Sequence, residues 1–304
     1  MTATSPVAPQ TTSAPPAPPQ WRSILFVPAT NERFLEKAHL RGADAIQVDL
    51  EDSVPMAAKE EARRRLPGVV DRLSALGVEV IVRINRPWRH AIADLELAVR
   101  QGVRAITLPK VETTGHVRAI DELVSELEAD RGLTAGSIGF LLLIESPAAL
   151  ARLAEIASSS TRVVAMTLGP EDYALAAGCS TDPEALMLPN LLVAQAAAAA
   201  GVRPLGFVGS IGEYGDAEAF RARVRQARRL GFRGAAVVHP AQVAILNEEF
   251  SFTADERSWA RRVVDVAEVA ALAGRAAFEV DGKMVDRPII LRARRILESP
   301  EGTS

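Results

Sequence analysis

The sequence predicts an α/β protein, a (β/α)8 barrel of the TIM type with a C-terminal helical extension. Two observations indicate this fold. Short apolar runs typical of buried parallel strands alternate eight times with amphipathic helical stretches. The length, 304 residues, suits one such barrel with an appendage. Counting strands does not demonstrate closure, so a doubly wound open sheet stays as an alternative.

The candidate strands are short runs of mainly Val, Ile, Leu and Ala, and the stretches between them have helical periodicity. The strands are Ser23–Pro28, Ala45–Leu50, Val80–Ile84, Ala105–Leu108, Gly139–Ile144, Val163–Leu168, Leu205–Val208 and Ala235–Val238. The helices are Glu32–Arg41, Ala57–Leu76, Asp94–Gln101, Thr114–Asp130, Ala148–Ser158, Pro183–Ala200, Asp216–Leu230 and Ala241–Phe250. Several helices are followed by a glycine suited to the C′ position, namely Gly42, Gly77, Gly102, Gly201 and Gly231.

The two ends of the chain differ from this alternating region, which covers residues 21–250. Residues 1–20 are rich in Pro, Ala, Thr and Ser and cannot bury a core, so we expect a disordered tail. Residues 251–304 form the extension, which we expect to act as a lid or an oligomer contact. It contains a helix over Ala254–Ala276, a turn at Asp281-Gly282 and a final helix near Pro288–Glu298.

Composition excludes several classes of protein. A net charge of −3 and a pI of about 5.9 do not suggest a nucleic-acid surface. No apolar run approaches the roughly 20 residues of a membrane span, and residues 1–20 lack the features of a secretory signal. The single cysteine, Cys179, excludes an internal disulfide and a cysteine-rich metal site. We therefore expect a cytoplasmic protein without membrane or nucleic-acid partners.

The stretch Phe140–Pro147, FLLLIESP, places a carboxylate at the end of a buried strand. Ser146 is suited to cap a helix that starts at Pro147, where a missing N–H costs nothing. Glu145 then lies at the carboxyl edge of the sheet, where parallel α/β proteins build active sites. The alternative is that Glu145 merely pairs with a neighbouring Lys or Arg.

The same arrangement recurs after other strands, so we expect a polar mouth of mixed charge. The residues concerned are Asp49, Glu51, Asp52, Arg83, Asn85, Lys110, Glu112, Glu171 and Asp172. Such a mouth suits a divalent cation with oxygen ligands and an anionic substrate. Glu145 and Asp172 are the candidate ligands for Mg²⁺, or for Mn²⁺. The alternative is a buried network in which the carboxylates only neutralise Lys110 and Arg83, but carboxylates outnumber these bases.

A set of motifs between residues 22 and 297 resembles the HpcH/HpaI aldolase and citrate lyase superfamily, in particular its CitE-like CoA-ester lyases. The motifs are RSILFVPATN (22–31), DLEDSV (49–54), VRIN (82–85), LPKVE (108–112), LIES (143–146), LGPEDYA (168–174), GFRGAAVVHPAQV (231–243) and GKMVDRP (282–288). The resemblance implies a TIM barrel that holds Mg²⁺ through Glu145 and Asp172. It also implies that Arg83 and Glu145 bind the substrate, with Arg83 at the substrate carboxylate, and that Arg83 takes part in catalysis by stabilising the alkoxide that forms.

The resemblance further implies contacts to CoA and a residue from the extension. Phe26, Arg33 and Lys37 of the first β–α unit would contact CoA. Asp286 would be the acid–base residue, often reaching the site of a neighbouring subunit, which makes a homotrimer or hexamer the expected assembly. Asp286 also stands where a helix N-cap is expected, two residues before Pro288, and this is the alternative role.

The implied activity is that of a Mg²⁺-dependent carbon–carbon lyase. It would cleave and form a 3-hydroxyacyl-CoA dicarboxylate, such as malyl-CoA or citramalyl-CoA, by reversible Claisen-type chemistry between an acyl-CoA and a 2-oxo acid. A thioesterase on the same scaffold and a non-catalytic accessory subunit are the alternatives. Asp52 stands where class II pyruvate aldolases of the superfamily have a histidine, which counts against a plain pyruvate aldolase. Leu205-Gly206-Phe207 lacks an aspartate common in CitE-like chains, which affects the acyl or CoA pocket.

Overall fold

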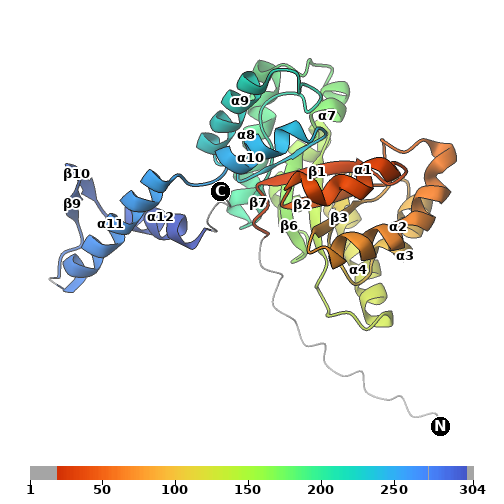
Figure 1. Ribbon diagram of the computed structural model, residues 1–304, viewed down its shortest axis with the longest axis horizontal. Coiled ribbons are helices and arrows are strands. Elements are labelled where there is room, and N and C mark those ends of the chain that lie inside the picture. The colour runs from red at the N-terminus through yellow and green to blue at the C-terminus, as the bar shows by residue number, and fades with distance from the viewer. Residues whose placement is uncertain (1–18, 273, 300–304) are drawn as a thin grey trace, which may run out of the picture.

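Eight parallel strands form one sheet that curls around a common axis, with helices on its outer side (Figure 1). The computed structural model describes residues 19–272 and 274–299, so most of the predicted tail lies outside the described residues. The strand order is β7-β6-β5-β4-β3-β2-β1-β8. The strands are β1 Ser23–Pro28, β2 Ala45–Asp49, β3 Glu79–Arg83, β4 Val103–Leu108, β5 Gly139–Ile144, β6 Val163–Leu168, β7 Arg203–Pro204 and β8 Ala235–Val237.

Backbone hydrogen bonds connect the two edge strands and close the barrel. The Arg233 N–H donates to the Pro204 carbonyl at 3.0 Å, and the Gly206 N–H donates to the Gly234 carbonyl at 2.8 Å. These bonds join the end of β7 to the start of β8. The predicted α/β barrel is thus confirmed, and an open doubly wound sheet is excluded.

The helices follow the strands in the predicted alternation. They are α1 Glu32–Lys37, α2 Lys59–Ala75, α3 Trp88–Ala98, α4 Thr114–Asp130, α5 Pro147–Leu150, α6 Leu153–Ala157, α7 Pro170–Ala177, α8 Pro183–Ala199, α9 Ala217–Leu230 and α10 Ala241–Glu249, with short 3-10 turns η1 Ala38–Arg41 and η2 Met56–Ala58. The five glycines predicted to end helices all have positive φ angles. Ser146 caps α5 as predicted, because its hydroxyl accepts the Ala149 N–H.

Three parts of the predicted pattern were wrong. The third helix is Trp88–Ala98 and not Asp94–Gln101. The seventh strand is Arg203–Pro204 and not Leu205–Val208, because Gly206 has a φ of 130° and turns the chain out of the strand. Residues 148–158 form two short helices instead of one. The sequence reading also missed α7, whose first turn begins at Pro170 directly after β6.

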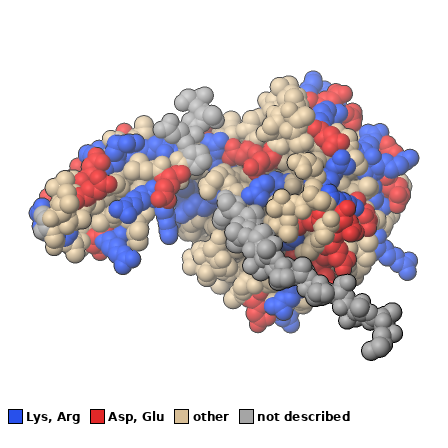
Figure 2. Space-filling view, turned by 90° about the horizontal axis from the view of Figure 1, so that it is seen from below, with Lys and Arg blue, Asp and Glu red and all other residues tan. Residues whose placement is uncertain are grey.

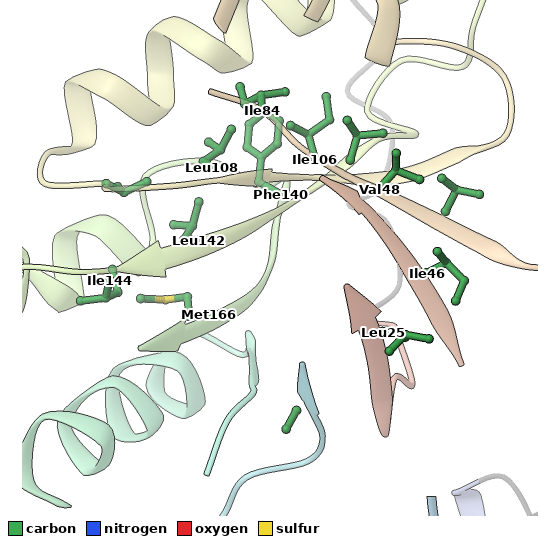
Figure 3. Close-up of a cluster of buried hydrophobic side chains, with 14 of the residues drawn as sticks. Leu25, Ile46, Val48, Ile84, Ile106, Leu108, Phe140, Leu142, Ile144 and Met166 are labelled. Carbon is green, nitrogen blue, oxygen red and sulfur yellow. The ribbon is translucent and has the colours of Figure 1, made fainter. Parts of the chain in front are cut away.

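Two hydrophobic cores follow from the period-two alternation of the strands. One set of side chains points outward and packs against the helices, as Ile106, Phe140 and Leu142 do in Figure 3. The other set, which includes Ile81, Ala105 and Leu141, fills the interior of the barrel. The strands are therefore buried on both faces, which explains their continuous apolar runs.

The C-terminal extension has a small core of its own. It consists of α11 Ala254–Leu272, the antiparallel hairpin of β9 Phe278–Val280 and β10 Lys283–Val285, and α12 Arg287–Glu298. Its six buried residues are Ala260, Val263, Val280, Val285, Ala293 and Ile296. In Figure 1 the extension projects away from the barrel, and the hairpin lies at its far end. The predicted turn at Asp281-Gly282 joins the two hairpin strands, and both of its residues have positive φ.

None of the helices in residues 19–272 and 274–299 combines the length and the apolar composition that a membrane-spanning segment needs.

Barrel closure can be tested at Gly234, which the backbone of Trp21 approaches closely. A Cβ atom at position 234 would lie 2.0 Å from the Trp21 carbonyl oxygen. Gly234→Ala should therefore lower the free energy of unfolding by about 1–3 kcal/mol or more, measured by urea denaturation. The control is Gly68→Ala in α2, where a Cβ has open space and alanine should stabilise by about 0.5–1 kcal/mol. Equal stability of Gly234→Ala and wild type would contradict the closure described here.

Candidate active site

Polar side chains gather at the carboxyl edge of the barrel because the strand alternation directs them inward there. Asp49, Arg83 and Glu145 lie an even number of residues beyond interior positions of their strands, such as Ala45, Ile81 and Leu141. Arg83 and Glu145 line a pocket with about 640 Å³ of empty space, open solvent included. Its lining is Phe26, Arg83, Leu143, Glu145, Thr167, Leu168, Gly169, Pro170, Glu171, Asp172, Asn190, Gly206, Phe207, Gly209, Ile211 and Ala236.

Arg83 is held in the pocket by a two-pronged ion pair. Asp49 and Arg83 are partners in the register of β2 and β3, so Nε and Nη2 donate to the two Asp49 oxygens at 2.7 and 2.8 Å. Arg83 Nη1 also lies 2.9 Å from Glu51 Oε2, and the guanidinium stacks 5.2 Å above the Phe26 ring. Burial lowers the pKa of Arg83, but Asp49 and Glu51 more than offset this, so the net shift is upward and the side chain stays charged.

Lys110 connects the carboxylates of three strand ends. Its ammonium lies 2.9 Å from Glu51 Oε1, 3.3 Å from Asp52 Oδ2 and 3.6 Å from Asp172 Oδ1. Its backbone has a φ of 50°, which aims its N–H at Glu145 Oε2, 2.5 Å away. Asp49, Glu51 and Asp52 thus pair with Arg83 and Lys110, as expected for a network in which the carboxylates neutralise these two bases. It leaves Glu145 without a side-chain cation of its own, since Lys110 pairs with other carboxylates.

Glu145 is the carboxylate whose surroundings least favour its charge. It is buried (5% exposed), and Gly169 lies so close that a Cβ there would be 2.5 Å from Glu145 Oε1. Burial raises the pKa of Glu145 to about 7, and the charges of Asp172 and Glu51 contribute to the increase. A raised pKa caused by burial and like charges, in a pocket, is typical of a functional carboxylate.

Glu145 and Asp172 fit a hard divalent cation. Both line the pocket, and Asp172 is close enough to raise the pKa of Glu145. Within the described residues no group of three His, Cys, Asp or Glu side chains could hold a metal. This fits Mg²⁺, which typically takes one or two protein carboxylates and fills the remaining positions with water and substrate oxygens.

The sequence did not single out Thr167 and Asn190, which line the pocket from β6 and from α8. Phe207, in the stretch that was expected to affect the acyl or CoA pocket, lines it from the loop after β7. Thr167 has a signal in the sequence, because it lies two residues before Gly169 in the strand-end motif. Asn190 is a polar residue in an apolar helix, and nothing in its spacing indicates that α8 faces the pocket there.

Of the remaining predicted residues, Phe26 lines the pocket, whereas Arg33, Lys37 and Asp286 are not among its lining residues. Phe26 lies beneath Arg83, but Arg33 and Lys37 are exposed on α1, outside the barrel. Glu32, which precedes Arg33 on α1, pairs with Arg65 and Arg72 of α2. Asp286 lies in the extension at the start of α12, where its side chain makes no capping hydrogen bond.

Comparison with known proteins identifies the family to which this barrel belongs. The family model of the HpcH/HpaI aldolase/citrate lyase family matches residues 22–240. The chain belongs to this family. It is 36% identical to the citrate lyase subunit beta of Escherichia coli K12 over 288 residues, which covers 92% of this chain and 93% of that protein. It is 33% identical to an L-malyl-CoA/beta-methylmalyl-CoA lyase of Cereibacter sphaeroides, with 95% and 96% covered.

A solved relative was crystallised with magnesium and coenzyme A, the metal and the cofactor that the resemblance implies. The crystal structure of CitE from Mycobacterium tuberculosis in complex with magnesium, acetoacetate and coenzyme A has a TM-score of 0.70 and 27% identity, covering 91% of this chain and 97% of that one. The expected family and, at the level of the family, the expected class of carbon–carbon lyase are therefore confirmed.

The raised pKa of Glu145 predicts a specific pH dependence of stability. With a pKa of about 7 in the folded protein and about 4.5 in the unfolded chain, the folded protein binds more protons between these values. This contribution is complete below pH 4.5 and is lost as the pH rises through 7. In EDTA, the free energy of unfolding of Glu145→Gln minus that of wild type should therefore increase by about 3 kcal/mol between pH 4.5 and pH 8.

Urea denaturation at several pH values measures this difference. Glu112→Gln is the matched control, because Glu112 is an exposed carboxylate at the same edge of the barrel; its profile should run parallel to that of wild type. A Glu145→Gln profile that also runs parallel to wild type would show that the carboxyl group titrates normally.

Proposed function

We propose that the protein is a Mg²⁺-dependent CoA-ester lyase that reversibly cleaves a 3-hydroxyacyl-CoA dicarboxylate, of the malyl-CoA or citramalyl-CoA type, into an acyl-CoA and a 2-oxo acid. One observation carries the proposal. In a chain of this family, two carboxylates, Glu145 and Asp172, line one pocket with a partly buried guanidinium, that of Arg83. Such a pocket suits a substrate that is itself an anion with adjacent oxygens.

Arg83 would bind the carboxylate of the 2-oxo acid. Its guanidinium is kept charged and immobile by Asp49, so little freedom is lost when a substrate binds. Nε and Nη2 already serve Asp49, so a substrate carboxylate would bind at Nη1, which lies 2.9 Å from Glu51 Oε2, and would share it with Glu51. The Phe26 ring below it holds the plane of the guanidinium.

Glu145 and Asp172 would hold the divalent cation. When bound, Mg²⁺ supplies a positive charge that polarises the carbonyl of the 2-oxo acid and orients it. Glu145 would then be ionised, since the cation offsets the unfavourable charge of its neighbours. Gly169 allows the Glu145 side chain to pack directly against the backbone after β6, because a Cβ at position 169 would lie 2.5 Å from Glu145 Oε1.

Asp286 would act as the acid–base residue of a neighbouring subunit. In the condensation direction it would take a proton from the acyl methyl group. The π electrons of the 2-oxo acid's carbonyl group then move to its oxygen, which takes up a proton and becomes the hydroxyl group, as the acyl carbon forms a carbon–carbon bond to the carbonyl carbon. In the cleavage direction that bond breaks, and Asp286 returns the proton. Asp286 follows the hairpin at the far end of the extension, away from the barrel of its own chain (Figure 1).

The first test measures activity and its metal dependence. Acetyl-CoA and propionyl-CoA, each with glyoxylate or pyruvate, should give a condensed product with Mg²⁺ and none in EDTA. Glu145→Gln and Asp172→Asn should abolish this activity while circular dichroism stays unchanged, because each removes a proposed ligand. Arg83→Lys should lower kcat/KM by an amount that corresponds to about 1.5–3 kcal/mol of transition-state stabilisation, the range for a charged hydrogen bond. Release of free CoA without a carbon–carbon product would identify a thioesterase, and turnover in Glu145→Gln at limiting Mg²⁺ would reject the metal site.

The second test concerns the nucleotide end of CoA. Arg33 and Lys37 are four residues apart on α1 and share one face, where they could bind its phosphates. The double change to alanine should raise KM for acyl-CoA about tenfold, roughly 1.4 kcal/mol, without altering activity on a truncated pantetheine thioester. The control is Arg65→Ala on α2, since Arg65 pairs with Glu61 and Glu32. Equal loss on both thioesters would rule out the nucleotide contact.

A further inference from the structure

We infer that Lys59, a buried lysine that does not line the pocket, is a positioning residue for Arg83. It acts through Glu51, whose carboxylate lies between the Arg83 guanidinium and the Lys110 ammonium. The inference rests on the proposed binding of a 2-oxo acid by Arg83 and adds a residue that this proposal does not use. It arises from a buried base on α2 whose position the stability of the fold does not explain.

Lys59 is buried, unlike most basic residues of this protein. Figure 2 shows Lys and Arg side chains over the surface of the barrel and along the extension, where water solvates their charge. Lys59 is only 7% exposed. This burial lowers its pKa, although the charges of Asp49 and Glu51 oppose the shift. A lysine is rarely buried to this extent without partners that compensate for the lost solvation.

The position of Lys59 on its helix is also unfavourable. Lys59 is the first residue of α2, where the partial positive charge of the helix N-terminus repels a base. The next two residues, Glu60 and Glu61, have the sign of charge that this end of a helix favours. Neither the stability of α2 nor the packing of an apolar core therefore accounts for a lysine at this position.

The ammonium of Lys59 binds the turn that carries Glu51. Its Nζ donates to the carbonyl oxygens of Leu50 and Glu51 at 2.7 and 2.6 Å. Asp49 binds the N–H groups of the same turn, because its two carboxylate oxygens accept the Glu51 and Ser53 N–H groups at 3.0 and 3.2 Å. Lys59 and Asp49 thus fix the turn from two sides, one through its carbonyl groups and the other through its N–H groups.

The turn does not need Lys59 to satisfy its carbonyl groups. The Leu50 carbonyl also accepts Asn85 Nδ2 at 2.9 Å, and the Glu51 carbonyl also accepts the Val54 N–H at 2.9 Å. A variant without the ammonium therefore keeps a donor for each carbonyl and should fold. What it loses is the second anchor that sets where the turn lies.

Glu51 transmits the position of this turn to the pocket. Its Oε2 lies 2.9 Å from Arg83 Nη1, and its Oε1 lies 2.9 Å from Lys110 Nζ. Nη1 is the nitrogen that a substrate carboxylate would share with Glu51, because Nε and Nη2 donate to Asp49. A shift of Glu51 relative to Nη1 therefore changes how well this nitrogen can bind the 2-oxo acid. Lys59 fixes that arrangement from outside the pocket.

Steady-state kinetics of Lys59→Met test this role, because methionine is similar in length but has neither the donors nor the charge. KM for the 2-oxo acid should rise about tenfold, the lower end of the range for groups that orient the ligands of a site. KM for acyl-CoA should stay unchanged. The matched control is Arg22→Met at the opposite end of the barrel, where Arg22 pairs with Asp44 at 2.7 Å; it should lower stability and change neither KM. A folded Lys59→Met with an unchanged KM for the 2-oxo acid would overturn the inference.

A double-mutant cycle tests whether Lys59 acts through Glu51. In a Glu51→Gln background, Lys59→Met should change KM for the 2-oxo acid less than about twofold, because the carboxylate that Lys59 positions is gone. Equal effects in both backgrounds would reject this route. Lys59→Arg, which keeps the charge and the donors, should return KM to within about threefold of wild type. Lys59→Gln, which keeps one donor group, serves as the second variant if Lys59→Met does not fold, and its KM for the 2-oxo acid should also rise.

Binding without turnover separates this inference from the proposed function. Titration calorimetry with pyruvate and Mg²⁺ should show about tenfold weaker binding to Lys59→Met than to wild type. Weaker pyruvate binding to this variant, in a protein without lyase activity, would keep Lys59 as a positioning residue and reject the lyase. Full lyase activity of Lys59→Met with the KM values of wild type would reject the inference and leave the lyase intact.

Discussion

Lys110 is the residue on which the arrangement of the pocket depends. Its backbone adopts a left-handed conformation that a non-glycine residue occupies only at a cost. In return its N–H binds Glu145, and its ammonium, on the same residue, reaches Glu51, Asp52 and Asp172. One residue at the end of β4 therefore positions carboxylates that come from β2, β5 and β6.

This arrangement separates two groups of carboxylates with different tasks. Asp49 is neutralised by Arg83, and its pKa is lowered because the hydrogen bonds and charge of Arg83 outweigh the effect of burial. Glu145 receives only a backbone donor from Lys110 and has a raised pKa. The first group fixes Arg83, whereas the second retains a need for positive charge. A divalent cation beside Glu145 would offset this unfavourable charge, since Lys110 and Arg83 are already engaged with other carboxylates.

The sequence predicted the barrel and the central site because both depend on local patterns. Apolar runs of five or six residues, each followed by a charged or polar residue, identified most strands and placed Arg83, Glu145 and Asp172 at one edge. The end of the seventh strand could not be predicted in this way, since Leu205 and Val208 are apolar and buried although the chain turns at Gly206. Asn190 was missed for a related reason. Its contact with the pocket depends on how α8 lies against the barrel, and tertiary packing of that kind has no sequence period.

The extension has several features that contact with a further surface would stabilise. Its core of six buried residues is small for an independent unit, and structures of this size usually gain stability from further contacts. Several of its apolar side chains, including Met284 and Leu291, nevertheless stay exposed, and Asp286 starts α12 without the hydrogen bond expected of an N-cap. Each of these features is unfavourable for the isolated chain. Each becomes favourable if a second surface covers the leucine and methionine and leaves the carboxylate free for chemistry. Stability of the extension, assembly and completion of the pocket would then be one equilibrium, shifted by protein concentration.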